Sequence, residues 1–256
     1  MATGFEQRFV GFVDILGFRS IVARMLDDPQ VFRTIRDALK TVARQATYFR
    51  KYRTDFNAAR RARMRRGGVS FVGDMKLQMT AFSDCYIVSD TRPAWHVLAA
   101  VQALGSRLLE EQILTRGGVV VGPAYHKAQV VFGPAVIEAY KLESEVAKYP
   151  RILVSEEVRE ATWGYHNGLC RGRLFRRDMD GCWFVNVLSP PLSDWEALSV
   201  PRAESDSRKH LRKLRGKLVS LLKHANRDAD HRAKVHWLVS QFNISAREAG
   251  CDEIDA

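Results

Sequence analysis

Cysteines are few in this sequence, and long apolar runs are missing. The four cysteines, Cys85, Cys170, Cys182 and Cys251, are scattered along 256 residues without a Cys-x-x-Cys pair. That spacing argues against both a zinc cage and a disulfide framework. No apolar run approaches the roughly 18 residues that span a bilayer, and the first residues lack the basic-then-apolar pattern of a secretion signal. We therefore expect a cytoplasmic protein with no membrane partner.

Acidic residues are outnumbered by basic ones. The chain has 40 Lys and Arg against 29 Asp and Glu, which gives a formal net charge of +11 and favours an anionic partner. The basic residues gather at 60–66 and at 208–217. Neither cluster carries the interleaved aromatic side chains that stack on bases. We interpret both as solvated helix faces and do not expect nucleic acid as a partner.

Hydrophobic periodicity divides most of the chain into alternating strands and helices. Short apolar runs predict strands at 9–15, 69–82, 85–89, 115–122, 124–132 and 151–154, and a hairpin of 169–174 with 182–187. Apolar residues at helical spacing predict helices over 20–26, 29–63, 93–114 and 134–148. The order strand, helix, strand, strand, helix, strand is that of a split βαβ arrangement. We therefore expect an α+β fold with a ferredoxin-like, mainly antiparallel sheet covered by helices on one face.

The composition changes after Pro190 and Pro191. Residues 203–250 are helix-forming, rich in Lys, Arg and His, and poor in strand formers. They predict a helical hairpin that breaks near 226–230. We therefore expect a first domain over residues 1–190 and a C-terminal helical extension over residues 191–256.

Two aspartates stand where predicted strands end. Asp14 closes a buried strand, and Asp84 lies at the tip of the hairpin between the second and third strands. If these strands are neighbours, the two carboxylates meet at one edge of the sheet. Mg²⁺ and Mn²⁺ take oxygen ligands and often use one or two carboxylates together with substrate phosphates. The pair is a candidate metal site, although a turn or cap role is the alternative for either aspartate alone.

Four blocks of sequence, in order, resemble the class III nucleotidyl cyclases. Residues 12–18 (FVDILGF) are similar to the first metal motif of that family, and residues 82–86 (FSDCY) to the second. Residues 116–119 (RGGV) resemble the strand that supplies a phosphate-binding arginine, and 132–143, beginning FGPAV, resemble the helix that follows. The likeness covers residues 7–188. It implies that the first domain is a catalytic domain that cyclises a nucleoside triphosphate.

The resemblance also implies metal ligands and a phosphate cradle. Asp14 and Asp84, with the main-chain carbonyl of Ile15, would hold two Mn²⁺ or Mg²⁺ ions per site. The turn of Leu16, Gly17 and Phe18 would bind the triphosphate with backbone N–H groups, as turns at helix starts commonly do.

Three further cations are implied by the same resemblance. Arg116 would bind the β- or γ-phosphate. Lys141 would act from the other protomer of a homodimer and steady charge on the reacting phosphate; a solvated lysine is the alternative. Arg176 or Arg177, in the late hairpin, would contact the terminal phosphates.

The positions that read the base depart from those of the purine cyclases. They are Thr80 and Val130 here, where purine cyclases have charged or polar pairs, and Ile137 stands in place of the family's asparagine. A site that lacks those polar groups loses much of its selectivity for a purine. The combination resembles the pyrimidine cyclases of bacterial Pycsar anti-phage defence. It implies conversion of UTP or CTP, with UTP preferred, to a 3′,5′-cyclic monophosphate that activates a separate effector.

The long helix predicted over 29–63 offers further base contacts. Tyr48, Arg50 and Tyr52 are candidates to contact the base, and helix packing is the alternative role for all three.

Other functions stay open at this point. One is a purine nucleotide cyclase. Another is a cyclase-like sensor that binds nucleotide or nucleic acid without turnover, which the basic clusters and Ile137 favour. A third is a palm-type enzyme such as a cyclic dinucleotide synthase or a polymerase. Those enzymes usually carry adjacent acidic residues at the hairpin, where this chain has only Asp84 between Ser83 and Cys85.

Overall fold

The structure is a computed structural model that describes residues 4–66, 76–91, 94–163, 174–190, 204–225 and 229–255. Residues 69–75 and 169–173 of the predicted strands lie outside this range, as do Cys170, the predicted break at 226–228 and residues 191–203 at the start of the predicted extension.

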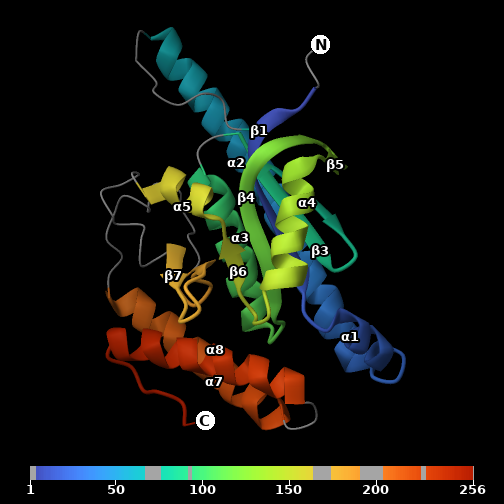
Figure 1. The fold of residues 1–256 in the computed structure, drawn as a ribbon, viewed down its shortest axis with the longest axis vertical. Helices are drawn as coiled ribbons and strands as arrows, with labels where there is room; N and C mark the ends of the chain where they lie inside the picture. The colour runs from blue at the N-terminus through green and yellow to red at the C-terminus, as the bar shows by residue number, and fades with distance from the viewer. Residues whose placement is uncertain are drawn as a thin grey trace.

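An eight-stranded sheet lies at the centre of the described residues (Figure 1). β5 (Val130–Phe132) pairs only with β4, and the other seven strands follow the order β2 (Gln78–Phe82), β3 (Cys85–Asp90), β1 (Glu6–Ile15), β4 (Thr115–Lys127), β6 (Ile152–Val154), β8 (Trp183–Val185) and β7 (Phe175–Arg177). Every pair is antiparallel except β4 with β6. In the order β2-β3-β1-β4, β3 separates β1 from β2, which is the split βαβ arrangement. The predicted α+β fold class is confirmed.

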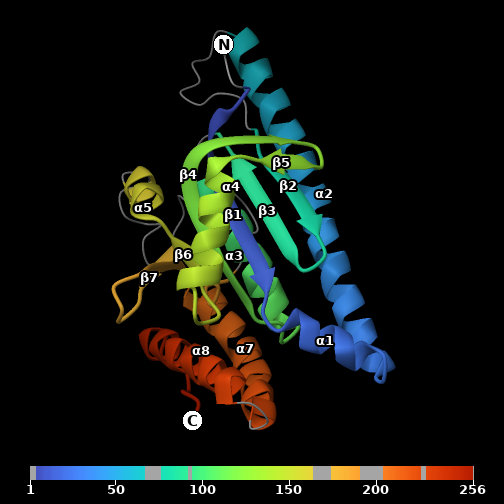
Figure 2. The same cartoon turned by 45° about the vertical axis from the view of Figure 1, so that its right-hand side comes forward.

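Helices cover both faces of this sheet, so the prediction of one covered face is wrong. The main core face carries α3 (Ala94–Glu110) and α5 (Glu156–Trp163), and α1 (Phe18–Met25) and α2 (Pro29–Arg65) also pack against that core. The other face carries α4 (Pro134–Lys141) and the π-helical turn η1 (Leu142–Val146). α4 packs Ala135 and Ala139 against Val10 and Val120 of the sheet. The alanines of α4 allow this close second layer. Figure 2 shows α4 lying over β1 and β4.

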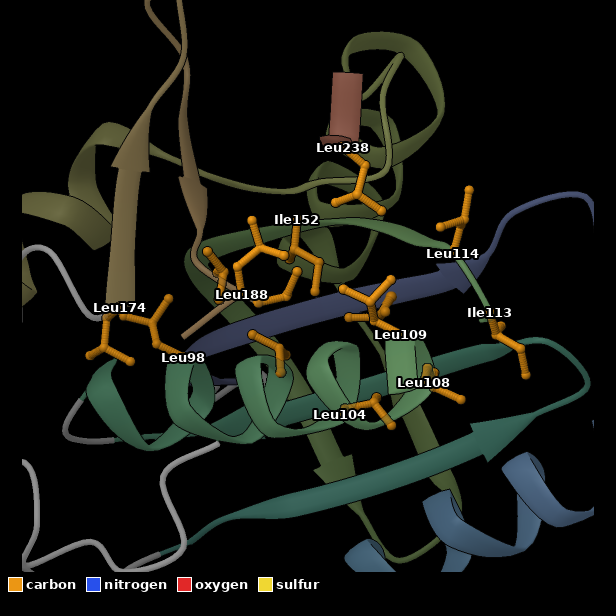
Figure 3. Packing of buried hydrophobic residues seen from close by; sticks show 14 of the residues in the cluster. Leu98, Leu104, Leu108, Leu109, Ile113, Leu114, Ile152, Leu174, Leu188 and Leu238 are labelled. Carbon is orange, nitrogen blue, oxygen red and sulfur yellow. The ribbon is translucent and has the colours of Figure 1, made fainter. Parts of the chain in front are cut away.

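The core on the α3 face is continuous with the C-terminal helices. α3 is buried almost all round because the sheet lies on one side of it and α7 (Glu204–His224) on another. Leu98, Leu104 and Leu108 of α3 belong to the same buried cluster as Leu238 of α8 (Ala229–Glu248) (Figure 3). The predicted C-terminal helical hairpin is therefore observed in α7 and α8, and the division of the chain at residue 190 remains a prediction.

A buried ion-pair cluster also attaches α8 to the sheet. Arg151, which has 2% of its side chain exposed, pairs with Asp178 and Asp180. The indole Nε1–H of Trp237 donates to Asp178 at 2.9 Å, and the Trp237 ring stacks on Tyr149 with centroids 5.5 Å apart. Hydrogen bonds to charged groups are among the stronger ones in proteins, so this cluster fixes α8 against the strand ends.

Several elements differ from the sequence prediction. β4 runs through Pro123 instead of ending at 122. The edge of β4 that faces β6 is paired with it only over 117–119. Pro123 lies outside that stretch, so the backbone N–H that proline lacks would have no hydrogen-bond partner on that edge. The first strand of the late hairpin is β7 at Phe175–Arg177, which begins after the predicted 169–174, and the helix α5 was not predicted.

No helix within the described ranges combines the length and apolar composition needed to cross a membrane.

Candidate active site

Strand register brings six side chains onto one partly uncovered surface of the sheet. Partners across an antiparallel ladder share a face, and alternate residues do also. Asp14 is paired with Cys85 and Phe12 with Ile87, while Ile87 and Cys85 are paired in turn with Thr80 and Phe82. We call this surface the open face because α4 lies over β1 and β4 and Phe82 is 78% exposed. The open face consists of Phe12, Asp14, Thr80, Phe82, Cys85 and Ile87.

The two candidate metal ligands lie together at one end of the open face. Asp14 is the last residue but one of β1, in register with Arg116 of β4. Asp84 lies in the turn between β2 and β3, and its carbonyl accepts the backbone N–H of Ile15 at 3.1 Å. Ser83, before it, has a positive φ of 54°, a sparsely populated conformation for a residue with a side chain. The turn is thus held in a strained form that places Asp84 beside the end of β1.

The Asp14 carboxylate is destabilised by its surroundings. Burial raises its pKa to about 6, and the nearby carboxylates of Glu143 and Asp84 act in the same direction. Arg116 opposes the shift, with its Nε 4.0 Å from Asp14 Oδ2. A carboxylate whose charge is opposed by burial and by like charges has the electrostatic surroundings expected of a functional site.

Glu143 is a member of this site that sequence reasoning assigned no role. Its side chain is 3% exposed and forms an ion pair with Arg116. Burial raises the pKa of Glu143, and the Arg116 guanidinium opposes the rise. The only signal in the sequence was its place in the block 132–143 that resembles the cyclase helix. Arg116 is therefore held between two carboxylates, with part of its five N–H donors left for another anion.

Close approach of α4 and η1 to β4 explains how Glu143 reaches the sheet. A Cβ on Gly118 would lie 2.6 Å from the carbonyl oxygen of Ala139 and 2.8 Å from Leu142 Cβ, so only glycine fits there. The π-helical turn then widens the end of the helix just where Glu143 begins to face inward. Such turns are rare and occur frequently at functional sites.

The turn at 16–18 lies directly after the metal-ligand strand. Gly17 has a φ of 72° and precedes α1, whose first turn has no side-chain cap. The first N–H groups of α1 are therefore available to an anion, and the helix dipole favours one there. The Leu16 N–H instead donates to the Leu114 carbonyl at 2.9 Å, so this one of the three predicted cradle residues has its backbone N–H already engaged within the chain.

The remaining predicted cations are not beside Asp14 within this chain. Lys141 is half exposed on α4 and pairs with Glu138 at 3.0 Å. Arg177 is on β7, which three strands separate from β1 in the sheet order, and its Nε donates to the Gly181 carbonyl at 3.1 Å. Arg176 pairs with Glu248 of α8.

The predicted base contacts of α2 have local roles in this structure. Tyr52 stacks on Tyr48 with ring centroids 6.4 Å apart and packs against the main core. Arg50 is exposed, and its carbonyl accepts the Thr54 hydroxyl at 3.0 Å.

Thr80 and Val130 have different surroundings. The Thr80 hydroxyl is 2.9 Å from His126 Nε2 and 2.9 Å from the Ala128 carbonyl, in the turn between β4 and β5. Val130, two residues later, is 55% exposed. The register pairs Val130 with Lys127 and His126 with Val131, so Val130 and His126 stand on opposite faces of the hairpin.

The oxygen donors at Asp14 and Asp84 fit a hard divalent cation. Their charges repel, and a cation would relieve the cost that burial and Glu143 impose on Asp14. Among the described residues, no group of three or more His, Cys, Asp or Glu is arranged to hold a metal ion. A site of two carboxylates would therefore need ligands from a main-chain carbonyl, water or substrate phosphates, which is usual for Mg²⁺.

No protein-family model and no curated protein matches the chain. Solved structures that are similar to it include two guanylyl cyclase domains and an adenylyl cyclase. The catalytic core of a rhodopsin-guanylyl cyclase with converted specificity, in complex with ATPαS, shares 15% identity with a TM-score of 0.46, over 71% of this chain and 96% of that one. The guanylyl cyclase domain of the RhoGC fusion protein from the aquatic fungus Blastocladiella emersonii shares 15% with a TM-score of 0.45, over 71% and 95%. A bacterial light-regulated adenylyl cyclase shares 13% with a TM-score of 0.44, over 82% of this chain and 57% of that one.

Proposed function

We propose that this protein is a pyrimidine nucleotide cyclase that converts UTP or CTP, with UTP preferred, to the 3′,5′-cyclic monophosphate and pyrophosphate. The observation that carries the proposal is the meeting of Asp14 and Asp84 at one end of the open face, beside Arg116 and the uncapped start of α1. The motifs around these residues are those that resemble the class III cyclases. By the same resemblance, the product would be a second messenger of anti-phage defence that activates a separate effector.

The residues of the site suit an in-line displacement at the α-phosphorus. The ribose 3′-oxygen would form a bond to that phosphorus while the bond to the bridging oxygen of the β-phosphate breaks, and pyrophosphate leaves with the hydroxyl proton passing to water. Divalent cations held by Asp14, Asp84 and the Ile15 carbonyl would lower the pKa of the 3′-hydroxyl and neutralise the phosphates when bound. Arg116 and the first N–H groups of α1 would bind phosphate oxygens. Catalysis would then consist mainly of positioning and charge neutralisation.

A homodimer would complete the site with Lys141. Ile137 and Tyr140, on the same helix as Lys141, are 56% and 52% exposed. Large apolar side chains clustered on one exposed surface are typical of interaction sites. We propose that this surface of α4 contacts the second protomer and that Lys141 reaches the phosphates there.

Pyrimidine preference follows from what the base would meet. By the family resemblance, Thr80 and Val130 stand where purine cyclases have the charged or polar pairs that read a purine edge, and they do not supply such a pair. An unpaired buried polar group costs about 1–3 kcal/mol, so a purine would bind more weakly in a closed site.

Product analysis tests the proposal directly. Purified protein is incubated with Mn²⁺ and all four nucleoside triphosphates at equal concentration, and the products are identified by mass. We expect cyclic UMP or cyclic CMP, loss of product in Asp14→Ala and Asp84→Ala, and normal activity in Asp252→Ala, an exposed aspartate near the C-terminus. Predominant cyclic AMP or cyclic GMP would overturn the pyrimidine assignment, and full activity in Asp14→Ala would overturn the metal site.

A nucleotide sensor without turnover is the second candidate. Ile137, at the family's asparagine position, has no polar atom to hold charge on the reacting phosphate. Tight binding of a triphosphate with no cyclic product would favour this function.

A further inference from the structure

A buried chain of hydrogen bonds joins four strands on the same side of the sheet as the open face, and Thr80 belongs to both. The Arg8 Nε–H donates to Ser89 Oγ at 2.9 Å, and Ser89 Oγ lies 2.7 Å from His126 Nδ1. His126 Nε2 lies 2.9 Å from Thr80 Oγ1, and the Thr80 hydroxyl donates to the Ala128 carbonyl at 2.9 Å. Arg8, Ser89, His126 and Thr80 are all less than 10% exposed. We call these four residues, together with Ala128, the relay.

The donors and acceptors of the relay determine one protonation pattern. Thr80 gives its only hydroxyl hydrogen to Ala128, so it can only accept from His126, which must carry its proton on Nε2. His126 Nδ1 then accepts the Ser89 hydroxyl, and Ser89 accepts from Arg8. Burial and the Arg8 charge lower the pKa of His126 to about 4, which keeps the imidazole neutral at pH 7. Every polar group in the relay is thereby satisfied.

The relay holds a projecting hairpin against the sheet. β4 pairs with β1 as far as Ala124, and the arm formed by its last residues and β5 (125–132) continues beyond. Figure 2 shows β4 curving over the ends of β2 and β3 with β5 alongside. Ala128 at the arm's turn has a φ of 53°. A non-glycine residue keeps such a conformation only where its surroundings impose it, and the Thr80 hydroxyl bonds to the carbonyl of this very residue.

We infer that the relay fixes the arm as the end wall of the base pocket, and that His126 and Thr80 are positioning residues that exclude the larger purine ring. The inference rests on the proposed function, in which the base lies at the Thr80 end of the open face. Thr80 is only 9% exposed, so a base at this end meets the arm before it meets the threonine. A purine has a second ring, and to enter it must displace the arm and break the bond from Thr80 to Ala128.

Two variants of Thr80 separate the relay from general packing. Thr80→Val keeps the shape of the side chain but removes the hydroxyl, and leaves His126 Nε2–H and the Ala128 carbonyl without a partner. Thr80→Ser keeps the hydroxyl and is the matched control. Ser89→Ala removes the hydroxyl between Arg8 and His126, at a fully buried residue that is not one of the six of the open face.

Hydrogen exchange and substrate competition are measured on the same preparations. In Thr80→Val we expect the amides of 125–132 to exchange about ten- to a hundredfold faster, the cost of the unpaired groups. Because the unpaired groups have the same energetic cost, the ratio of kcat/KM for the preferred pyrimidine to kcat/KM for ATP or GTP should fall at least about tenfold. The change should appear in KM and not in kcat. Ser89→Ala should change both quantities in the same direction, and Thr80→Ser should leave both near their wild-type values.

The outcomes distinguish this inference from the proposed function. A faster-exchanging arm with unchanged selectivity overturns the role of the arm as a wall, and unchanged exchange overturns the role of the relay. If the wild type binds nucleotides but forms no cyclic product, the cyclase proposal fails alone, because the same ratio is then read from dissociation constants. If it binds no nucleotide, both fail.

Discussion

Replacement of Asp14 by asparagine should stabilise the folded protein at neutral and alkaline pH. A carboxyl that titrates at about 6 in the folded chain and at 3.8 when unfolded costs about 3 kcal/mol of stability once both states are ionised. Asparagine has nearly the same shape and carries no charge, so it removes the cost of burial and of repulsion by Glu143 and Asp84. Arg116 keeps its ion pair with Glu143, and no buried cation is left unpaired.

The sign and the pH window follow from the direction of the shift. Because the folded pKa lies above the unfolded one, the native state binds more protons between pH 3.8 and about 6, and stability falls as the pH rises through this range. The gain from Asp14→Asn should therefore be about 3 kcal/mol at pH 8 and only about 1 kcal/mol at pH 4.5.

Urea unfolding at the two pH values measures this difference, since midpoints at constant slope report stability. Asp252→Asn, in an exposed segment, is the control and should change stability little at either pH. A loss of stability in Asp14→Asn at pH 8, or a gain that does not depend on pH, would refute the electrostatic account. Added Mn²⁺ should stabilise the wild type and leave Asp14→Asn unchanged, because ligand binding to the native state raises its stability.

Three further outcomes are expected. Mixing Asp14→Ala and Lys141→Ala proteins should restore about a quarter of wild-type activity, since half of the exchanged dimers are hybrids with one intact site; no recovery after demonstrated exchange would exclude a shared site. Arg116→Ala should lose about 3 kcal/mol because Glu143 is left buried and unpaired, and adding Glu143→Gln should recover most of it in urea unfolding. His126 is neutral when folded, so its lowered pKa makes stability fall as the pH drops from 6.5 towards 4. The stability difference between wild type and His126→Gln should shrink by about 3 kcal/mol between pH 7.5 and 4, and a constant difference would contradict the buried neutral histidine.

Local sequence patterns carried enough information for the split βαβ arrangement, and for placing Asp14 and Asp84 at strand ends that meet if the strands are neighbours. A short apolar run that ends at an aspartate, and a two-residue turn between strands, are properties of neighbouring residues. The alternation of one long strand, a helix and a hairpin then leaves few ways to pair the strands. The same reasoning failed at β4, where Pro123 suggested a break that the unpaired outer edge does not require.

Contacts between distant residues could not be predicted in this way. Thr80 and His126 are 46 residues apart in sequence, and nothing near either residue indicates that the other lies within hydrogen-bonding distance. Glu143 follows a regular helix, and periodicity alone gives no reason for the π-helical turn that faces it inward. Both contacts depend on how closely α4 and the arm approach the sheet, which packing determines and local propensity does not.

The two ends of the open face differ in whether their charged and polar groups are stabilised. At one end, burial and neighbouring like charges destabilise the ionised Asp14 carboxylate. This lowers the stability of the fold, so a functional reason for it is expected. At the other end the buried relay leaves no polar group unpaired, which makes that end rigid. An unrelieved negative charge suits a place where a cationic ligand arrives, while a satisfied network suits a place that has to keep its shape. The first end therefore fits the chemistry at the phosphates, and the second fits selection of the base.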